Sequence, residues 1–147
     1  MAKVYLSLGS NLGNKEQQMQ QAIEKIEKYC GEIVAQSSFY VTEPWNMQTK
    51  NLFLNGAVEL ETSLSPFSLL LKLQQIEKEM GRINKTKNKE YEDRIIDIDI
   101  LMYDDLKIDT FELSLPHPSM WERPFVLKPL VEIYPDILNQ KPMANKK

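Results

Sequence analysis

The chain has 147 residues, of which 42% are hydrophobic and 27% charged, so its length and composition predict a single globular domain over residues 1–147. Its net charge of -3 argues against a dedicated nucleic-acid-binding protein, because such proteins neutralise phosphates with basic residues. No apolar run approaches the length of a membrane span and one cysteine cannot form an internal disulfide, so we expect a cytoplasmic protein.

The first predicted elements are a strand and a helix. Apolar residues alternate from Val4 to Leu8, which predicts a strand. The segment 9–13 has glycines too closely spaced for a Walker phosphate loop, and we interpret it as a structural turn. Asn14 is predicted to cap a helix that ends at Gly31. The apolar stripe of this helix comprises Met19, Ala22, Ile23, Ile26, Tyr29 and Cys30. Cys30 fits a small core residue better than a nucleophile.

Two further strands are predicted before the second helix. The first covers Ile33 to Val41, and the core face of the second comprises Leu52, Leu54, Val58 and Leu60. Between them, Trp45 lies in a polar loop, where it is either tucked onto the core or used on a ligand. Phe53 and Asn55 share the opposite face of the later strand. An aromatic ring beside an amide suits a flat heteroaromatic ligand, but a loop-covered phenylalanine and an edge asparagine fit the spacing too.

A second helix is predicted to begin at Ser65 and Pro66, a capping hydroxyl followed by proline, and to end at Gly81. Its apolar stripe comprises Leu69, Leu70, Leu73, Ile76 and Met80. Glu77 interrupts this stripe, three residues after Gln74. A carboxylate at such a position is costly unless it is paired or lies at the rim of a site.

The segment from Arg82 to Asp93 loses all periodicity and is rich in cations, which predicts a loop. Charge runs are usually solvated surface. However, Arg82 and Arg94 bracket this loop, and paired arginines beside acidic residues also suit the neutralisation of phosphates.

The most informative stretch is the isoleucine-rich segment from Arg94 to Tyr103, which predicts a strand. Its core face comprises Ile96, Ile98, Ile100 and Met102. Asp97 and Asp99 share the other face, and two carboxylates that close repel each other unless a cation lies between them. Mg²⁺ is the usual cation for such oxygen ligands. A solvated outer face is the alternative interpretation of this spacing.

After residue 103 the sequence predicts a turn over 104–106, short strands within 107–115 and a helix over 126–134. His117 is the only histidine, which argues against a zinc site. The element order predicts an α+β fold, a ferredoxin-like βαββαβ antiparallel sheet with helices packed on it and a C-terminal extension.

Six segments together resemble the hydroxymethyl-dihydropterin pyrophosphokinase family. They are YLSLGSNLG at 5–13, SSFYVTEP at 37–44, FLN at 53–55, IEKEMGR at 76–82, DRIIDIDIL at 93–101 and LPHP at 115–118. The resemblance implies a ferredoxin-like enzyme of folate biosynthesis that transfers pyrophosphate from ATP to the hydroxymethyl group of a dihydropterin and releases AMP.

The resemblance also implies roles for individual residues. Asp97 and Asp99 would hold two Mg²⁺ ions, with Arg82 and Arg94 as the catalytic, phosphate-contacting arginines. The implied ATP site comprises Gln74, Glu77, Arg82, Lys85, Arg94, Ile100, His117 and Arg123. The implied pterin site comprises Thr42, Pro44, Trp45, Phe53, Asn55 and Phe125. The partners would be these small molecules, with no nucleic acid or membrane, and we expect a monomer.

Two other functions remain open at this stage. A nucleotide-binding module of the same fold without turnover is one, because the cations of the 83–93 loop differ from the family pattern. A Mg²⁺-dependent phosphohydrolase built on the same aspartate pair is the other.

Overall fold

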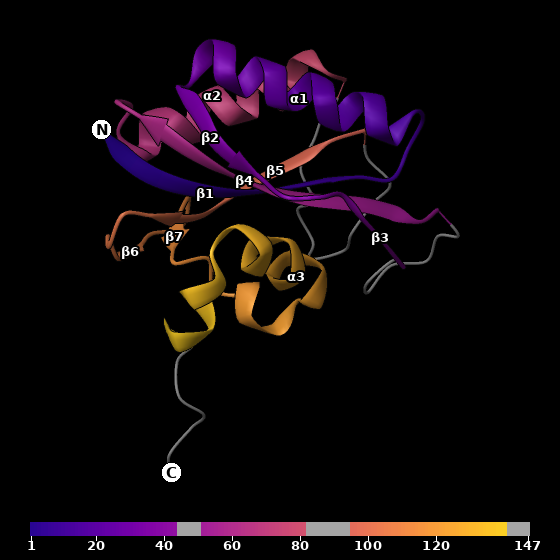
Figure 1. Cartoon of the computed structure of the whole chain (residues 1–147). Helices are drawn as coiled ribbons and strands as arrows, with labels where there is room; N and C mark the ends of the chain where they lie inside the picture. Colours follow the sequence, from indigo (N-terminus) through magenta and orange to yellow (C-terminus); the bar gives the residue numbers. More distant parts are fainter. Residues whose placement is uncertain (44–50, 82–94, 141–147) are drawn as a thin grey trace.

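The structure is a computed structural model that describes residues 1–43, 51–81 and 95–140. Its sheet is flanked by α1 and α2 on one face and by α3 on the other (Figure 1). The strands are β1 (Ala2–Ser10), β2 (Glu32–Gln36), β3 (Tyr40–Thr42), β4 (Phe53–Thr62) and β5 (Asp97–Tyr103), with β6 (Ile108–Asp109) and β7 (Ser114–Leu115) as a separate pair. The helices are α1 (Lys15–Tyr29), α2 (Pro66–Glu79) and α3 (Pro124–Ile133), with 3₁₀ turns η1 (Met120–Glu122) and η2 (Pro135–Gln140).

The main sheet is antiparallel, in the order β2-β4-β1-β5. The short β3 pairs with the first residues of β4, and β2 pairs with the later ones. Two βαβ halves that interleave their strands give this order, so the predicted ferredoxin-like α+β fold is confirmed. The predicted helix starts are confirmed as well. The Asn14 side chain accepts a hydrogen bond from the Gln17 amide, and the Ser65 hydroxyl accepts one from the Ser68 amide.

Two details of the strands predicted before α2 are wrong. The expected strand from Ile33 to Val41 is divided into β2 and β3 by residues 37–39, where the Ser37 hydroxyl accepts the hydrogen bond of the Ala57 amide in place of a backbone carbonyl. Leu52 precedes β4 and is exposed rather than in the core.

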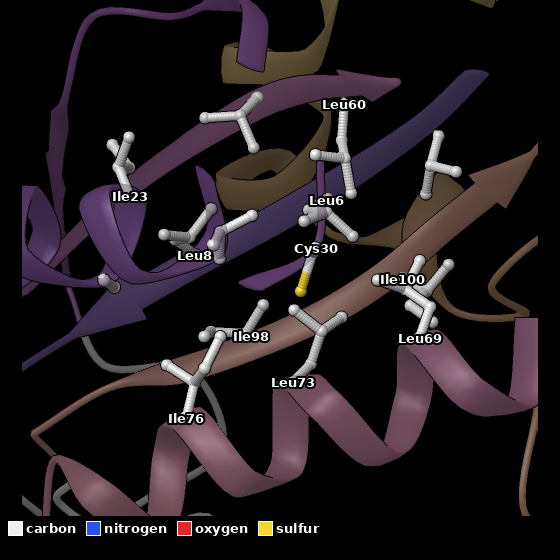
Figure 2. Packing of buried hydrophobic residues seen from close by; sticks show 14 of the residues in the cluster. Leu6, Leu8, Ile23, Cys30, Leu60, Leu69, Leu73, Ile76, Ile98 and Ile100 are labelled. Atoms are coloured by element: carbon white, nitrogen blue, oxygen red, sulfur yellow. The ribbon is translucent and has the colours of Figure 1, made fainter. Parts of the chain in front are cut away.

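The larger core, here the helix-side core, lies between the sheet and the helices α1 and α2. Figure 2 shows Leu6 and Leu8 of β1 and Ile98 and Ile100 of β5 pointing toward α2. Cys30 is buried among them, and burial raises the pKa of its thiol to about 11. The prediction that Cys30 is a core residue is therefore confirmed.

A smaller core, here the α3-side core, lies on the opposite face of the sheet. The C-terminal segment that we expected only as an extension provides it by packing α3 against β4 and β1. Met102 belongs to this core and not to the face of Ile100, contrary to the prediction. A register shift between Tyr5 and Leu6 places one extra residue in β5, and the shift reverses the alternation beyond Ile100.

Candidate active site

Asp97 and Asp99 begin β5 on the face of the sheet that α3 covers. They pair with Gly9 and Ser7 of β1, and both are partly exposed. Their neighbours Ile98 and Ile100 point into the helix-side core, so strand alternation directs both carboxylates the other way. The described residues contain no group of three or more His, Cys, Asp and Glu side chains that could hold a metal.

The donor set of this pair fits Mg²⁺. The ion is commonly bound by one or two carboxylates and completes its octahedral shell with water and substrate phosphates. Asp97 and Asp99 supply two hard oxygen ligands from one strand, at a partly open position where phosphates can approach.

Glu77 lies directly behind this strand. It is 2% exposed, and its Oε2 accepts a hydrogen bond from the Ile98 amide at 2.6 Å. Since β5 is the terminal strand of the described sheet, the Ile98 amide faces away from β1 and has no ladder partner there. The carboxylate that interrupts the apolar stripe therefore satisfies the edge of the strand that carries both aspartates. Gln74, one turn earlier on α2, is exposed.

The backbone of Ile100 is available at the same edge. In an antiparallel pair, every second residue directs both its amide and its carbonyl away from the partner strand. Ile98 and Ile100 pair with Leu8 and Leu6 in one uninterrupted register, so both residues face outward. The amide and carbonyl of Ile100, which the resemblance assigns to the ATP site, thus point to the edge of β5 away from β1.

A row across three strands joins the aspartates to the amide of Asn55. Asp97 pairs with Gly9, and Gly9 pairs with Asn55 of β4. A Cβ atom on Gly9 would lie 3.1 Å from Asn55 Oδ1 and 3.8 Å from a ring carbon of Phe53. Gly9 thus leaves open the space between the carboxylates and the groups expected to bind a flat ligand.

Sequence reasoning missed Gly9, which we assigned to a structural turn. A glycine at the end of an alternating strand can mark the close approach of a ligand. Only the register of β1 with β4 and β5 shows which side chains it separates.

The orientation of the Asn55 amide follows from its partner on β3. Asn55 is 4% exposed, and its Nδ2 donates a hydrogen bond to Thr42 Oγ1 at 2.5 Å. Its Oδ1 is consequently the atom directed over Gly9. Thr42, which the resemblance assigns to the pterin site, therefore orients an acceptor through its side chain.

Arg123 and Phe125 stand at the start of α3. Pro124 occupies the first helical position, and the Arg123 guanidinium lies over the Phe125 ring with 6.0 Å between its Cζ and the ring centroid. Phe125 packs at the border of the α3-side core, and α3 contacts β4, the strand of Phe53. Phe53 and Phe125 thus come from two elements, β4 and α3, that are in contact on this face of the sheet.

His117 lies further along the same edge. Its amide donates to the Leu101 carbonyl at 2.9 Å, and its Nδ1 accepts from the Ser119 amide at 3.2 Å. Nδ1 as acceptor leaves the ring proton on Nε2 in the neutral imidazole. His117 also lines a cavity of about 540 Å³, together with Lys107, Asp109 and Trp121.

Five of the predicted site residues lie outside the described residues: Pro44, Trp45, Arg82, Lys85 and Arg94. Their roles stay predictions. The described helices include none that is long and apolar enough to cross a membrane.

Comparisons with known proteins bear on this site. The family model of 7,8-dihydro-6-hydroxymethylpterin-pyrophosphokinase (HPPK) matches residues 5–135. The chain is 43% identical to 2-amino-4-hydroxy-6-hydroxymethyldihydropteridine pyrophosphokinase of Porphyromonas gingivalis over 146 residues, 99% of each chain. It is 41% identical to the protein of the same name from Aquifex aeolicus, with 100% of this chain and 91% of the relative covered.

A solved structure shows the same fold. A crystal structure of HPPK-DHPS in complex with substrates superposes with a TM-score of 0.75 at 16% identity. The match covers 92% of this chain but only 40% of that longer chain, and at this identity it bears on the fold alone. The family match and the relatives over the full length decide the assignment: this chain belongs to the 7,8-dihydro-6-hydroxymethylpterin-pyrophosphokinase family.

Proposed function

We propose that this chain transfers the pyrophosphoryl group of ATP to the hydroxymethyl oxygen of 6-hydroxymethyl-7,8-dihydropterin, in folate biosynthesis. One observation carries the proposal beyond family membership. The row Asp97–Gly9–Asn55, with Asp99 beside it, supports the proposal: two carboxylates suited to a metal–phosphate group share a face of the sheet with an oriented amide and an aromatic ring, and a glycine lies between them.

The reaction needs no protein nucleophile. The hydroxymethyl oxygen attacks the β-phosphorus of ATP and loses its proton. The bond from the β-phosphorus to the oxygen bridging it to the α-phosphorus breaks, and AMP leaves with the electron pair. Such an in-line displacement depends on alignment and on neutralisation of phosphate charge.

Asp97 and Asp99 would hold two Mg²⁺ ions, which supply charge neutralisation and orientation of the phosphates when bound. Arg82 and Arg94 would contact the same phosphates, with Lys85 as a further cation. Arg123 at the start of α3 and the Nε2 proton of His117 would complete the polar contacts to ATP. The outward backbone of Ile100 would meet the adenine edge, and Gln74 and Glu77 would lie behind it.

The pterin would lie between Phe53 and Phe125, because a flat ring is held well by two aromatic faces. The Oδ1 atom of Asn55 would accept from a ring N–H or amino group, which fits the donor-rich edge of a pterin. Backbone groups of Thr42, Pro44 and Trp45 would read the donor and acceptor edge of the pterin together with Asn55. We further propose that the protein acts in the cytoplasm as a monomer with these small molecules as its partners.

The test is a product assay with the protein, ATP, Mg²⁺ and 6-hydroxymethyl-7,8-dihydropterin. We expect equal amounts of AMP and pterin diphosphate, and loss of both products when EDTA is present. Formation of ADP or free phosphate instead would identify a phosphohydrolase. Binding of both substrates in calorimetry without any product would identify a nucleotide-binding module. Either of these results would overturn the proposal.

A further inference from the structure

A polar cluster outside the site joins α3 to β3. Glu132, in the last turn of α3, accepts hydrogen bonds from the Ser38 amide at 3.0 Å, the Ser38 hydroxyl at 3.1 Å and the Tyr40 hydroxyl at 2.6 Å. One carboxylate thereby accepts hydrogen bonds from three donors within residues 38–40, where β3 begins. We call Glu132, Ser38 and Tyr40 the α3–β3 clamp.

The clamp is electrostatically consistent. The hydrogen bond from Tyr40 lowers the pKa of the Glu132 carboxyl, and the same bond raises the pKa of the Tyr40 hydroxyl. The carboxylate is therefore ionised and the phenol protonated at neutral pH, the pair of states that makes the strongest hydrogen bond. Lys128, one turn before Glu132, places its ammonium 5.4 Å from the centre of the Tyr40 ring and adds a second contact of α3 to this tyrosine.

Both ends of the clamp lead to the candidate pterin site. Phe125 precedes Glu132 by seven residues on α3, and residues two turns apart lie on one side of a helix. On the other element, Tyr40 pairs with Asn55 and Thr42 pairs with Phe53. Thr42 in turn receives the hydrogen bond that orients the Asn55 amide.

The clamp therefore links the two walls of the site. β3 has only three residues and pairs with β4 on one side, so its ladder alone holds it weakly. Ser38 and Tyr40 contact α3 through hydrogen bonds to a single helix side chain, that of Glu132. Loss of that side chain would free β3, and with it Thr42, to shift relative to α3 and Phe125.

We propose that Glu132 is a positioning residue for the flat substrate. Through Tyr40 and Ser38 it fixes β3 against α3, and so sets the spacing of Phe125 from Phe53 and the direction of the Asn55 amide. The proposal rests on the proposed function for the identity of the substrate. It assigns to the clamp an effect on pterin binding that ATP binding does not share. Asp97, Asp99 and the edge of β5 lie on the far side of β1 from β3, and Arg123 stays in place with α3 when β3 shifts.

The test compares Tyr40→Phe, which removes one hydroxyl, with Glu132→Ala, which removes the whole acceptor, and with the double variant, in steady-state kinetics. We expect each single variant to raise the KM for the pterin about tenfold, which corresponds to about 1.4 kcal/mol of lost binding. The KM for ATP and kcat should stay within about twofold of the parent values. The double variant should resemble Glu132→Ala, because Tyr40→Phe removes a contact that Glu132→Ala already breaks.

The matched control is Glu24→Ala, the same chemical change at an exposed position of α1, which should leave every constant unchanged. Pterin binding to each variant is also measured directly by calorimetry. An unchanged pterin KM, an equal rise in both KM values, or additive effects in the double variant would each overturn the positioning role. If the parent protein binds the pterin but forms no diphosphate, the proposed function fails, while the binding data still decide the role of Glu132.

Discussion

At the scale of single residues, the structure gives each aspartate of β5 a position that folding does not require. Asp97 and Asp99 point away from the helix-side core and are partly exposed. Neither carboxylate contributes apolar burial, so their replacement should affect the reaction far more than stability.

We expect Asp97→Asn and Asp99→Asn each to lower kcat by about a thousandfold or more. Loss of a metal ligand removes several kcal/mol of charge stabilisation from the transition state. The melting temperature should change little, as scanning calorimetry would show. Asp136→Asn, at an exposed position of η2, is the control with normal turnover. Turnover close to that of the parent in either β5 variant would contradict the metal assignment.

Gly9 matters to the site because it has no side chain. In Gly9→Ala the new methyl group would lie 3.1 Å from Asn55 Oδ1, in the space between the aspartates and the amide. We expect the KM for the pterin to rise about tenfold or more, the effect of one misplaced methyl group in a binding pocket. Kinetics with each substrate varied in turn would test this. A rise confined to the KM for ATP would show that the pterin does not occupy this space.

At the scale of elements, β5 depends on a side chain of α2. Glu77 accepts the hydrogen bond of the Ile98 amide, which in the middle of a sheet a neighbouring strand would accept. It shows how a costly buried carboxylate can be retained, because it satisfies a backbone donor that would otherwise be buried without a partner.

Glu77→Ala should lower the free energy of unfolding by about 1–3 kcal/mol, the cost of leaving the Ile98 amide unsatisfied. Glu77→Gln should recover most of this loss, because the amide oxygen of glutamine can still accept. Urea denaturation of both variants, with the exposed Lys78→Ala as the control on α2, measures the difference. Equal stability of Glu77→Ala and Lys78→Ala would show that the hydrogen bond does not hold the edge.

At the scale of the whole molecule, the sheet is covered on both faces, and the two cores have different structural roles. The helix-side core builds the sheet and aligns β1, β4 and β5. The α3-side core attaches the element that carries Arg123 and Phe125. Pterin binding should therefore depend on the smaller core as well as on the groups that touch the ligand.

Leu130 is fully buried in the α3-side core, and Leu130→Ala should cost about 2–5 kcal/mol of stability. Leu73→Ala in the helix-side core should cost a similar amount. We expect only Leu130→Ala to weaken pterin binding beyond its effect on the folded fraction, because it loosens α3. Calorimetric titration at a temperature where both variants are folded would test this, and equal pterin affinity in the two would refute it.

Local sequence determined most of the elements of this protein. Alternation and helical periodicity are local properties, so they located the first strand, the caps at Asn14 and Ser65 and the isoleucine strand. The same alternation placed Asp97 and Asp99 on one face. It failed at Met102, because a bulge depends on how two strands pair and leaves no local signal.

Only the tertiary structure decided which of these residues meet. Gly9, Asn55 and Asp97 belong to three strands far apart in the chain, and their row exists only through the register of β1 with β4 and β5. The partners of Glu77, Asn55 and Glu132 are likewise distant in sequence. The sequence determines the chemistry of each side chain. Which side chains come into contact is decided only when the sheet and its two cores bring distant segments together.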